Sequence, residues 1–174
     1  MRRIRYAVAI SLDSFVAGPN DEFDWITSDP DIDFATIFRE FDIFLMGRRT
    51  YEVMSKQGQS AISGKRVLVA SRALRPESCP NATVLGEDLE PTLRQLRREP
   101  GKDVWLFGGG SLFRSLLGFG LVDTVEVSIV PILLGGGIPF LPSPATRANL
   151  RYTGQTLYPK SGILTVRYDV LGAQ

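Results

Sequence analysis

The sequence predicts an α/β fold whose central sheet is parallel in its first part and antiparallel at its C-terminal edge. Short apolar segments alternate with amphipathic ones through residue 118, an order typical of parallel sheets covered by helices. After residue 118 the segments have strand composition, and the last two flank the turn sequence PKSG as a hairpin. The length of 174 residues favours one domain that spans residues 1–174.

The predicted strands are runs of apolar and β-branched residues that end in glycine or in a polar turn. In chain order they cover residues 4–11, 42–47, 65–71, 82–85, 103–110, 123–133, 150–158 and 162–171. No apolar stretch approaches the roughly 18 residues that indicate a transmembrane helix. The N-terminus, MRRIRYAVAIS, is basic and then apolar, but its apolar part is short, so it is interpreted as the first strand and not as a signal peptide.

The predicted helices are segments that lie between these strands. They cover residues 28–41, 48–56, 89–99 and 111–118. The first is expected to begin with Ser28 or Asp29 as its cap and Pro30 in its first turn. The third carries three leucines on one face, as expected for a helix that packs on a sheet.

The composition excludes several kinds of protein and site. With 20 basic and 19 acidic residues the net charge is +1, which gives no support for a nucleic-acid or membrane-surface binder. Cys79 is the only cysteine, so there is no internal disulfide and a cytoplasmic protein is expected. Histidine is absent, which excludes a Ser-His-Asp triad, a Cys-His pair and a histidine-ligated zinc site. Acid–base chemistry must therefore come from carboxylates, Lys, Tyr, water or a cofactor.

Three strand ends share one pattern, in the sequences LMG-RRT, VAS-RAL and FGG-GSL. In open α/β sheets, ligands bind at the carboxyl ends of the strands. Gly108, Gly109 and Gly110 precede a predicted helix, whose unpaired N–H groups suit a phosphate or pyrophosphate. A tight turn without a ligand is the alternative, although a turn needs fewer than three glycines. The triplet is not a GxGxxG motif, because Phe113 stands at the last position.

The sequence MGRRTYE offers a second phosphate site. Gly47 allows the backbone to turn, and Thr50 can cap the following helix. Arg48 and Arg49 add positive charge where the helix dipole already attracts anions. The alternative is that both arginines are simply solvated.

Ser71 and Arg72 follow a third strand. A hydroxyl beside a guanidinium suits a phosphate monoester, such as the 2'-phosphate that distinguishes NADP from NAD. By itself this dipeptide is a weak signal for a phosphate site. The prediction is supported because the same pattern recurs at the other two strand ends.

A cluster of carboxylates precedes the second predicted strand. If residues 28–41 are helical, Asp31 shares a face with Phe34 and Phe38, whereas Asp33 points to the opposite side. A carboxyl on an apolar face is costly unless it is paired, protonated or in use. Asp31 is therefore a candidate proton donor or substrate anchor, and a helix cap is an equally good interpretation of it.

Taken together, these motifs resemble the dihydrofolate reductase-like family, in the branch of the C-terminal reductase domain of the bifunctional riboflavin biosynthesis deaminase-reductase. The resemblance covers nearly the whole chain. It is carried by AISLDSFVAG, DW at 24–25, LMGRRTYE, VLVASR, FGGGSLFRSLL and VPILLGGGIPFL, in this order. It implies a three-layer α/β/α fold with a central mixed, mostly parallel sheet and an antiparallel C-terminal hairpin, and NADPH as the cofactor.

The resemblance also implies a role for each matching position. The nicotinamide end of NADPH would contact Ala9, Ile10, Val16 and Ala17. The phosphates would be held by Gly47, Arg48, Arg49 and Thr50, and the 2'-phosphate by Ser71 and Arg72. The pyrophosphate and ribose would lie along Gly108, Gly109, Gly110, Ser111, Leu112 and Phe113.

The substrate side matches the family less well. Asp31 falls at about the position where folate reductases carry the acidic residue that protonates and anchors the pterin, although Asp29 and Asp33 are close enough to be confused with it. Trp25 can stack on a flat heterocycle or simply cover the core. Ser14 stands where many relatives have glycine, and the deaminase domain of the bifunctional enzymes is missing, so membership of that pathway does not follow.

The resemblance therefore implies an NADPH-dependent reductase that transfers a hydride to a small pterin- or pyrimidine-like substrate. No metal, nucleic acid or membrane is expected as a partner. A homodimer formed through the C-terminal strands is expected by analogy with the riboflavin-type relatives. The alternatives are an NADP-binding sensor or degenerate paralogue without turnover, and an interaction module that binds no dinucleotide.

Overall fold

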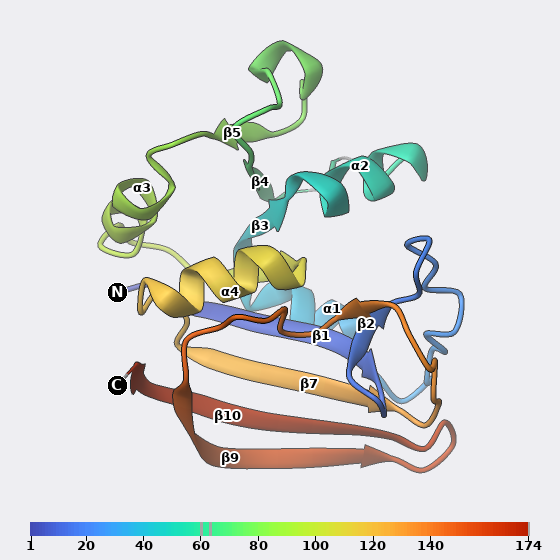
Figure 1. The fold of residues 1–174 in the computed structure, drawn as a ribbon. Coiled ribbons are helices and arrows are strands. Elements are labelled where there is room, and N and C mark those ends of the chain that lie inside the picture. Colours follow the sequence, from blue (N-terminus) through green and yellow to red (C-terminus); the bar gives the residue numbers. More distant parts are fainter. Residues whose placement is uncertain (60, 63, 174) are drawn as a thin grey trace.

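A computed structural model describes residues 1–59, 61–62 and 64–173 of the chain (Figure 1). Its strands are β1 (Ile4–Ser11), β2 (Phe15–Ala17), β3 (Phe41–Gly47), β4 (Arg66–Ala70), β5 (Thr83–Leu85), β6 (Asp103–Gly108), β7 (Thr124–Val130), β8 (Ile138–Pro139), β9 (Ala148–Tyr158) and β10 (Ile163–Ala173). Its helices are α1 (Phe34–Arg39), α2 (Arg48–Lys56), α3 (Leu89–Leu96) and α4 (Gly110–Gly118), and a short 3-10 helix covers Pro76–Ser78.

Eight strands form one sheet in the order β5-β4-β3-β6-β1-β7-β10-β9, and β2 pairs with β8 in a small second sheet. The strands from β5 to β7 in this order are parallel to one another, whereas β10 is antiparallel to both β7 and β9. The prediction of a mostly parallel sheet with an antiparallel C-terminal hairpin is therefore confirmed.

Helices cover both faces of this sheet, because its strands bury apolar side chains on both sides. On one face, α3 and α4 pack against Ile4, Tyr6 and Leu106. On the other face, α1 and α2 pack against an aromatic cluster that includes Phe44 and Trp105. In Figure 1, α4 crosses the near face of the sheet and α1 lies behind it. The layers confirm the predicted three-layer architecture.

The first helix is shorter than predicted. It begins at Phe34, and Asp33 caps it by accepting a hydrogen bond from the Thr36 N–H at 2.9 Å. Neither of the two expected caps, Ser28 and Asp29, caps this helix. Asp29 is instead buried and accepts hydrogen bonds from the N–H groups of Asp31 and Ser161, each at 2.9 Å. Ser161 belongs to the β9–β10 turn, so a contact with the distant hairpin holds the segment before α1 as a loop.

The remaining boundaries differ by a few residues. The third helix ends at Leu96 instead of residue 99, and β7 ends at Val130 instead of residue 133. Within the described residues, no helix is long and apolar enough to cross a membrane.

Candidate functional site

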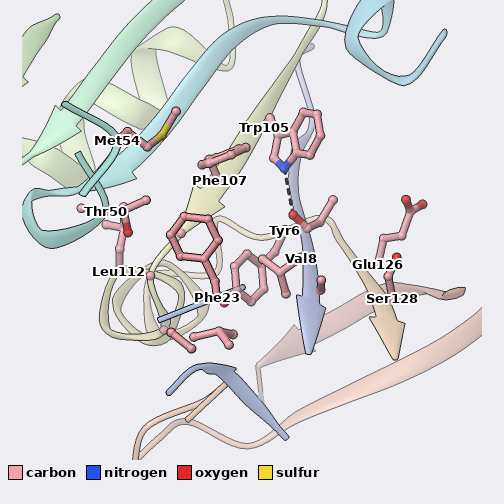
Figure 2. Close-up of a pocket in the computed structure, with 18 of the residues that line it drawn as sticks. Tyr6, Val8, Phe23, Thr50, Met54, Trp105, Phe107, Leu112, Glu126 and Ser128 are labelled. Carbon is pink, nitrogen blue, oxygen red and sulfur yellow. Dashed lines mark hydrogen bonds between the residues drawn. The ribbon is translucent and has the colours of Figure 1, made fainter. Parts of the chain in front are cut away.

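One large cavity, of about 1160 Å³, lies mainly on the α1 and α2 face of the sheet, and its lining also includes Tyr6 and Val8 from the opposite side of β1 (Figure 2). Pockets for single small ligands usually have volumes of about 300–1000 Å³, so this cavity is large enough for two ligands. Its junction half is formed where β3, β4 and β6 end, at residues 47–50, 70–72 and 108–112. Its strand half lies over β1, β7 and β10, next to the segment 31–37.

The β3–α2 junction brings an uncapped helix end to the cavity. Gly47 is the N-cap of α2, and no side chain in the described part of the chain bonds to the free N–H groups of the first turn. Thr50 was expected to cap this helix, but it lies inside α2, where it cannot be the cap. Arg48 and Arg49 line the cavity, and each already pairs with a carboxylate, Glu52 at 3.0 Å and Asp21 at 2.6 Å.

The three glycines at the β6–α4 junction have separate structural reasons. Gly108 has a φ of +147°, a backbone conformation that residues with a side chain rarely adopt. A Cβ on Gly110 would come within 2.6 Å of the Pro139 carbonyl oxygen. Gly109 is the N-cap of α4 with an ordinary φ of −95°, and a Cβ there would meet only the Thr50 hydroxyl, at 3.5 Å. Gly109 therefore leaves open space beside a second uncapped helix end.

The two helix ends lie next to each other. A Cβ placed on Gly47 would be 3.8 Å from the Gly109 nitrogen. The free N–H groups and the positive ends of two helix dipoles thus meet at one end of the cavity, where an anion is favoured.

Ser71 and Arg72 complete the junction half at the end of β4. The Ser71 hydroxyl oxygen accepts hydrogen bonds from the N–H groups of Ala73 at 3.1 Å and Leu74 at 3.0 Å, and this fixes the turn. Arg72 is exposed and has no ion-pair partner among the described residues. Its guanidinium is available for a phosphate.

Most of the predicted cofactor residues line this cavity, and two do not. The lining includes Ala9, Val16, Ala17, Gly47, Arg48, Arg49, Thr50, Ser71, Arg72, Gly108, Gly109, Gly110, Ser111 and Leu112. Ile10 is outside the lining and buried in the core, although Tyr6 and Val8 on the same side of β1 do belong to the lining. Phe113 is also outside it, because its ring stacks on Tyr6 at 4.0 Å in the core on the α4 face.

The predicted substrate residues are only partly brought to the strand half. Asp31 lines the cavity, but it precedes α1, is exposed, and pairs with Lys160 at 2.9 Å. The helical argument for Asp31 is therefore wrong, since residues 28–33 are not helical. Trp25 lies outside the lining, and its indole N–H donates to the Glu22 carbonyl at 3.2 Å.

The strand half also contains a polar floor that sequence reasoning missed. Arg167 Nε donates to Glu126 Oε2 at 2.8 Å, and the hydroxyl oxygens of Ser128 and Thr165 are 2.8 Å apart. Glu126 and Ser128 project from β7 on the same side in Figure 2. The alternating polar residues of TVEVSIV and ILTVRYDV were a signal for a polar face in these two strands.

Aromatic side chains form the wall between the two halves. Trp105 and Phe107 of β6 lie with ring centroids 5.5 Å apart and both line the cavity. The Trp105 indole N–H donates to the Ala7 carbonyl at 2.9 Å, which fixes the ring against β1 (Figure 2). No group of three or more Cys, Asp or Glu side chains in the described ranges is placed to hold a metal ion.

Comparison with known proteins places this geometry in context. An uncharacterized protein of Bacillus subtilis, YyaP, is 31% identical over 96% of this chain and 94% of its own length. A solved structure from Shewanella sp. PV-4, whose name refers to riboflavin biosynthesis, has a TM-score of 0.82 and 21% identity, over 98% of this chain and 99% of that one.

A third match links the fold to the reductases. Dihydrofolate reductase from Enterococcus faecalis, solved in complex with NADP(H), has a TM-score of 0.70 and 13% identity, over 97% of this chain and 96% of that one. The fold is therefore dihydrofolate reductase-like, as predicted. Residues 2–161 match the RibD C-terminal domain. The chain belongs to the RibD C-terminal domain family.

Proposed function

We propose that this protein is an NADPH-dependent reductase that transfers a hydride to a small pterin- or pyrimidine-like heterocycle. The observation that carries the proposal is the pair of uncapped helix ends at Gly47 and Gly109, which meet at one end of a cavity with room for two ligands. Membership of the RibD C-terminal domain family, and a fold shared with a dihydrofolate reductase solved with NADP(H), support it.

The residues of the junction half fit this cofactor. The free N–H groups after Gly47 and Gly109 would hold the pyrophosphate, for which the open space at Gly109 is needed. Arg72 would pair with the 2'-phosphate, because its guanidinium has no other partner in the described residues. The bound nicotinamide would supply the hydride.

The strand half would orient the substrate and limit its contact with water. Ala7 and Ala9 present small side chains on the floor, which leaves room for a flat ring. Trp105 and Phe107 form an apolar wall beside that ring. Asp31, on the rim, is the proposed proton donor, directly or through a water molecule.

The proposal is tested by titrating the purified protein with NADPH and NADH while the fluorescence of Trp25 and Trp105 is followed. We expect micromolar binding of NADPH and much weaker binding of NADH. Pterins and pyrimidine nucleosides are then screened for oxidation of NADPH. Binding of NADPH without turnover of any of them would favour the sensor, and failure of both dinucleotides to bind would overturn the proposal.

A further inference from the structure

We infer that the strand half selects a flat nitrogen heterocycle that presents N–H donors to Glu126 and carries no phosphate group. The inference rests on the proposed function and specifies its substrate. It draws on the polar floor and on the distribution of charge around the cavity. It separates this chain from reductases whose pyrimidine substrate bears a phosphorylated sugar.

The first support is the acceptor that Glu126 offers. Its side chain is 19% exposed, and the ion pair with Arg167 engages Oε2. A carboxylate accepts hydrogen bonds at both oxygens, so Oε1 can take an N–H from a ligand. Arg167 also donates to the Thr156 hydroxyl at 3.1 Å, and this second bond holds the guanidinium against β9 and keeps Glu126 in place.

The second support is the shape of the floor beside Glu126. Ser128 is two residues further along β7, so both side chains face the cavity, about 6.6 Å apart along the strand. Ala7 is the β1 neighbour of Glu126, and Ala9 is the β1 neighbour of Ser128. Two polar groups in line beside two methyl groups suit a flat ring with polar atoms along one edge.

The third support is the charge of the strand half. The described lining residues there include four carboxylates, Asp31, Asp33, Glu40 and Glu126, and two arginines, Arg5 and Arg167. Both arginines are already paired, Arg5 with Glu40 and Arg167 with Glu126. Lys160, which lies outside the lining, pairs with Asp31, so among the described residues Asp33 is the carboxylate left without an ion-pair partner. A phosphate would meet a net negative field without a free guanidinium, whereas an uncharged or cationic heterocycle is favoured.

The test is calorimetric titration with two probes, 2,4-diaminopyrimidine and uridine monophosphate, of the protein alone and of the protein saturated with NADPH. We expect the wild type to prefer 2,4-diaminopyrimidine. Glu126→Gln should lower the affinity for 2,4-diaminopyrimidine by about tenfold or more, because a charge-assisted hydrogen bond is lost. The same change frees Arg167, so uridine monophosphate should bind more tightly to the variant than to the wild type.

Glu90→Gln is the matched control, because Glu90 also pairs with one arginine, Arg94 at 2.8 Å, but lies on α3 outside the cavity. It should leave both affinities unchanged. Three outcomes would overturn the inference. In the first two, the wild type binds uridine monophosphate as tightly as 2,4-diaminopyrimidine or more tightly, or it binds neither probe. The third outcome is that the affinities of Glu126→Gln equal those of Glu90→Gln.

The wild-type preference needs no variant, so the inference is still tested if Glu126→Gln folds poorly. Failure of NADPH to bind would overturn the proposed function. The titration of the protein alone still decides the role of Glu126 in that case. Normal NADPH binding without the expected probe preference would count against this inference only.

Discussion

The two halves of the cavity are assembled in opposite ways. The junction half consists of three short, contiguous segments, each at the point where a strand ends. The strand half is dispersed, since Ala7, Glu126 and Arg167 come from three strands that are neighbours only in the folded sheet. A backbone site can therefore be recognised from local sequence, whereas a side-chain site depends on strand pairing that the sequence does not display.

The halves also differ in charge. Three arginines, Arg48, Arg49 and Arg72, line the junction half against Asp21 and Glu87, whereas carboxylates exceed arginines in the strand half. A dinucleotide and a phosphate-free substrate would each find the field that suits its own charge. Substitutions in one half should therefore leave the affinity of the other half's ligand unchanged.

The largest expected effect is that of Gly109→Val, which should abolish NADPH binding. The fold should tolerate the change, because φ is ordinary and a Cβ has only the Thr50 hydroxyl nearby, but the side chain would occupy the space of the pyrophosphate. Gly136→Val is the control, since Gly136 also has open space and lies outside the lining. A folded Gly109→Val protein with unchanged NADPH affinity in the fluorescence titration would remove the central claim about the junction half.

Asp31→Asn tests the strand half in the same manner. It should lower kcat by about 100-fold, as expected for loss of a general acid, and leave the affinity for NADPH unchanged. Steady-state kinetics and the fluorescence titration measure the two quantities separately. Asp24→Asn, an exposed carboxylate outside the lining, is the control. If both variants turn over like the wild type, Asp31 is not the proton donor.

Arg72→Ala should make the binding free energy of NADPH less favourable by about 1–3 kcal/mol, the magnitude of a charge-assisted hydrogen bond. NADH should be affected much less, because it lacks the 2'-phosphate. The same titration with Arg75→Ala, an exposed arginine outside the lining, provides the control. Equal losses for both dinucleotides would mean that the 2'-phosphate is bound elsewhere.

The smallest effect concerns the contact between the segment before α1 and the β9–β10 turn. Hydrogen bonds from the Ser161 side chain and from the backbone N–H groups of Asp31 and Ser161 hold the pKa of Asp29 below its usual range. A lowered folded-state pKa stabilises the fold above the unfolded pKa of about 3.9, and this contribution is lost as pH falls through the folded pKa.

Asp29→Asn should therefore lower Tm at neutral pH. The difference in Tm between the variant and the wild type should shrink as the pH falls below about 4. Thermal unfolding of both proteins across this range measures the effect. Asp24→Asn should follow the wild type at every pH. A pH-independent difference would show that packing, and not the charge of Asp29, stabilises the contact.

Much of the fold could be predicted because its signals are local. The apolar runs and glycine stops placed β1 and α2 at the residues where the structure has them. Asp31 was misplaced because a contact between Asp29 and Ser161, more than a hundred residues apart, overrides the helix signals at Pro30. Long-range hydrogen bonds of this kind leave no mark in a local pattern.

The candidate site was predicted less completely, for related reasons. Ala9 and Ile10 were assigned together from the resemblance, whereas only Ala9 lines the cavity and Ile10 is buried in the core. Phe113 is needed by the core, where truncating a packed aromatic ring costs about 3–5 kcal/mol. Glu126 and Arg167 belong to strands in which polar and apolar residues alternate. This alternation does not predict which face of the sheet lines the cavity, because that depends on where the helices pack.

The central position of β1 sets the order in which this molecule can be made. Ile4 pairs with Val104, and Ser11 pairs with Val130, so β1 has no neighbour in the sheet until residues 103–130 have been synthesised. At about 5–20 residues per second this delay is roughly 5–20 s. During translation β1 is therefore an exposed apolar segment of the kind that chaperones bind, and the strand half cannot form before Arg167 of β10 has been synthesised.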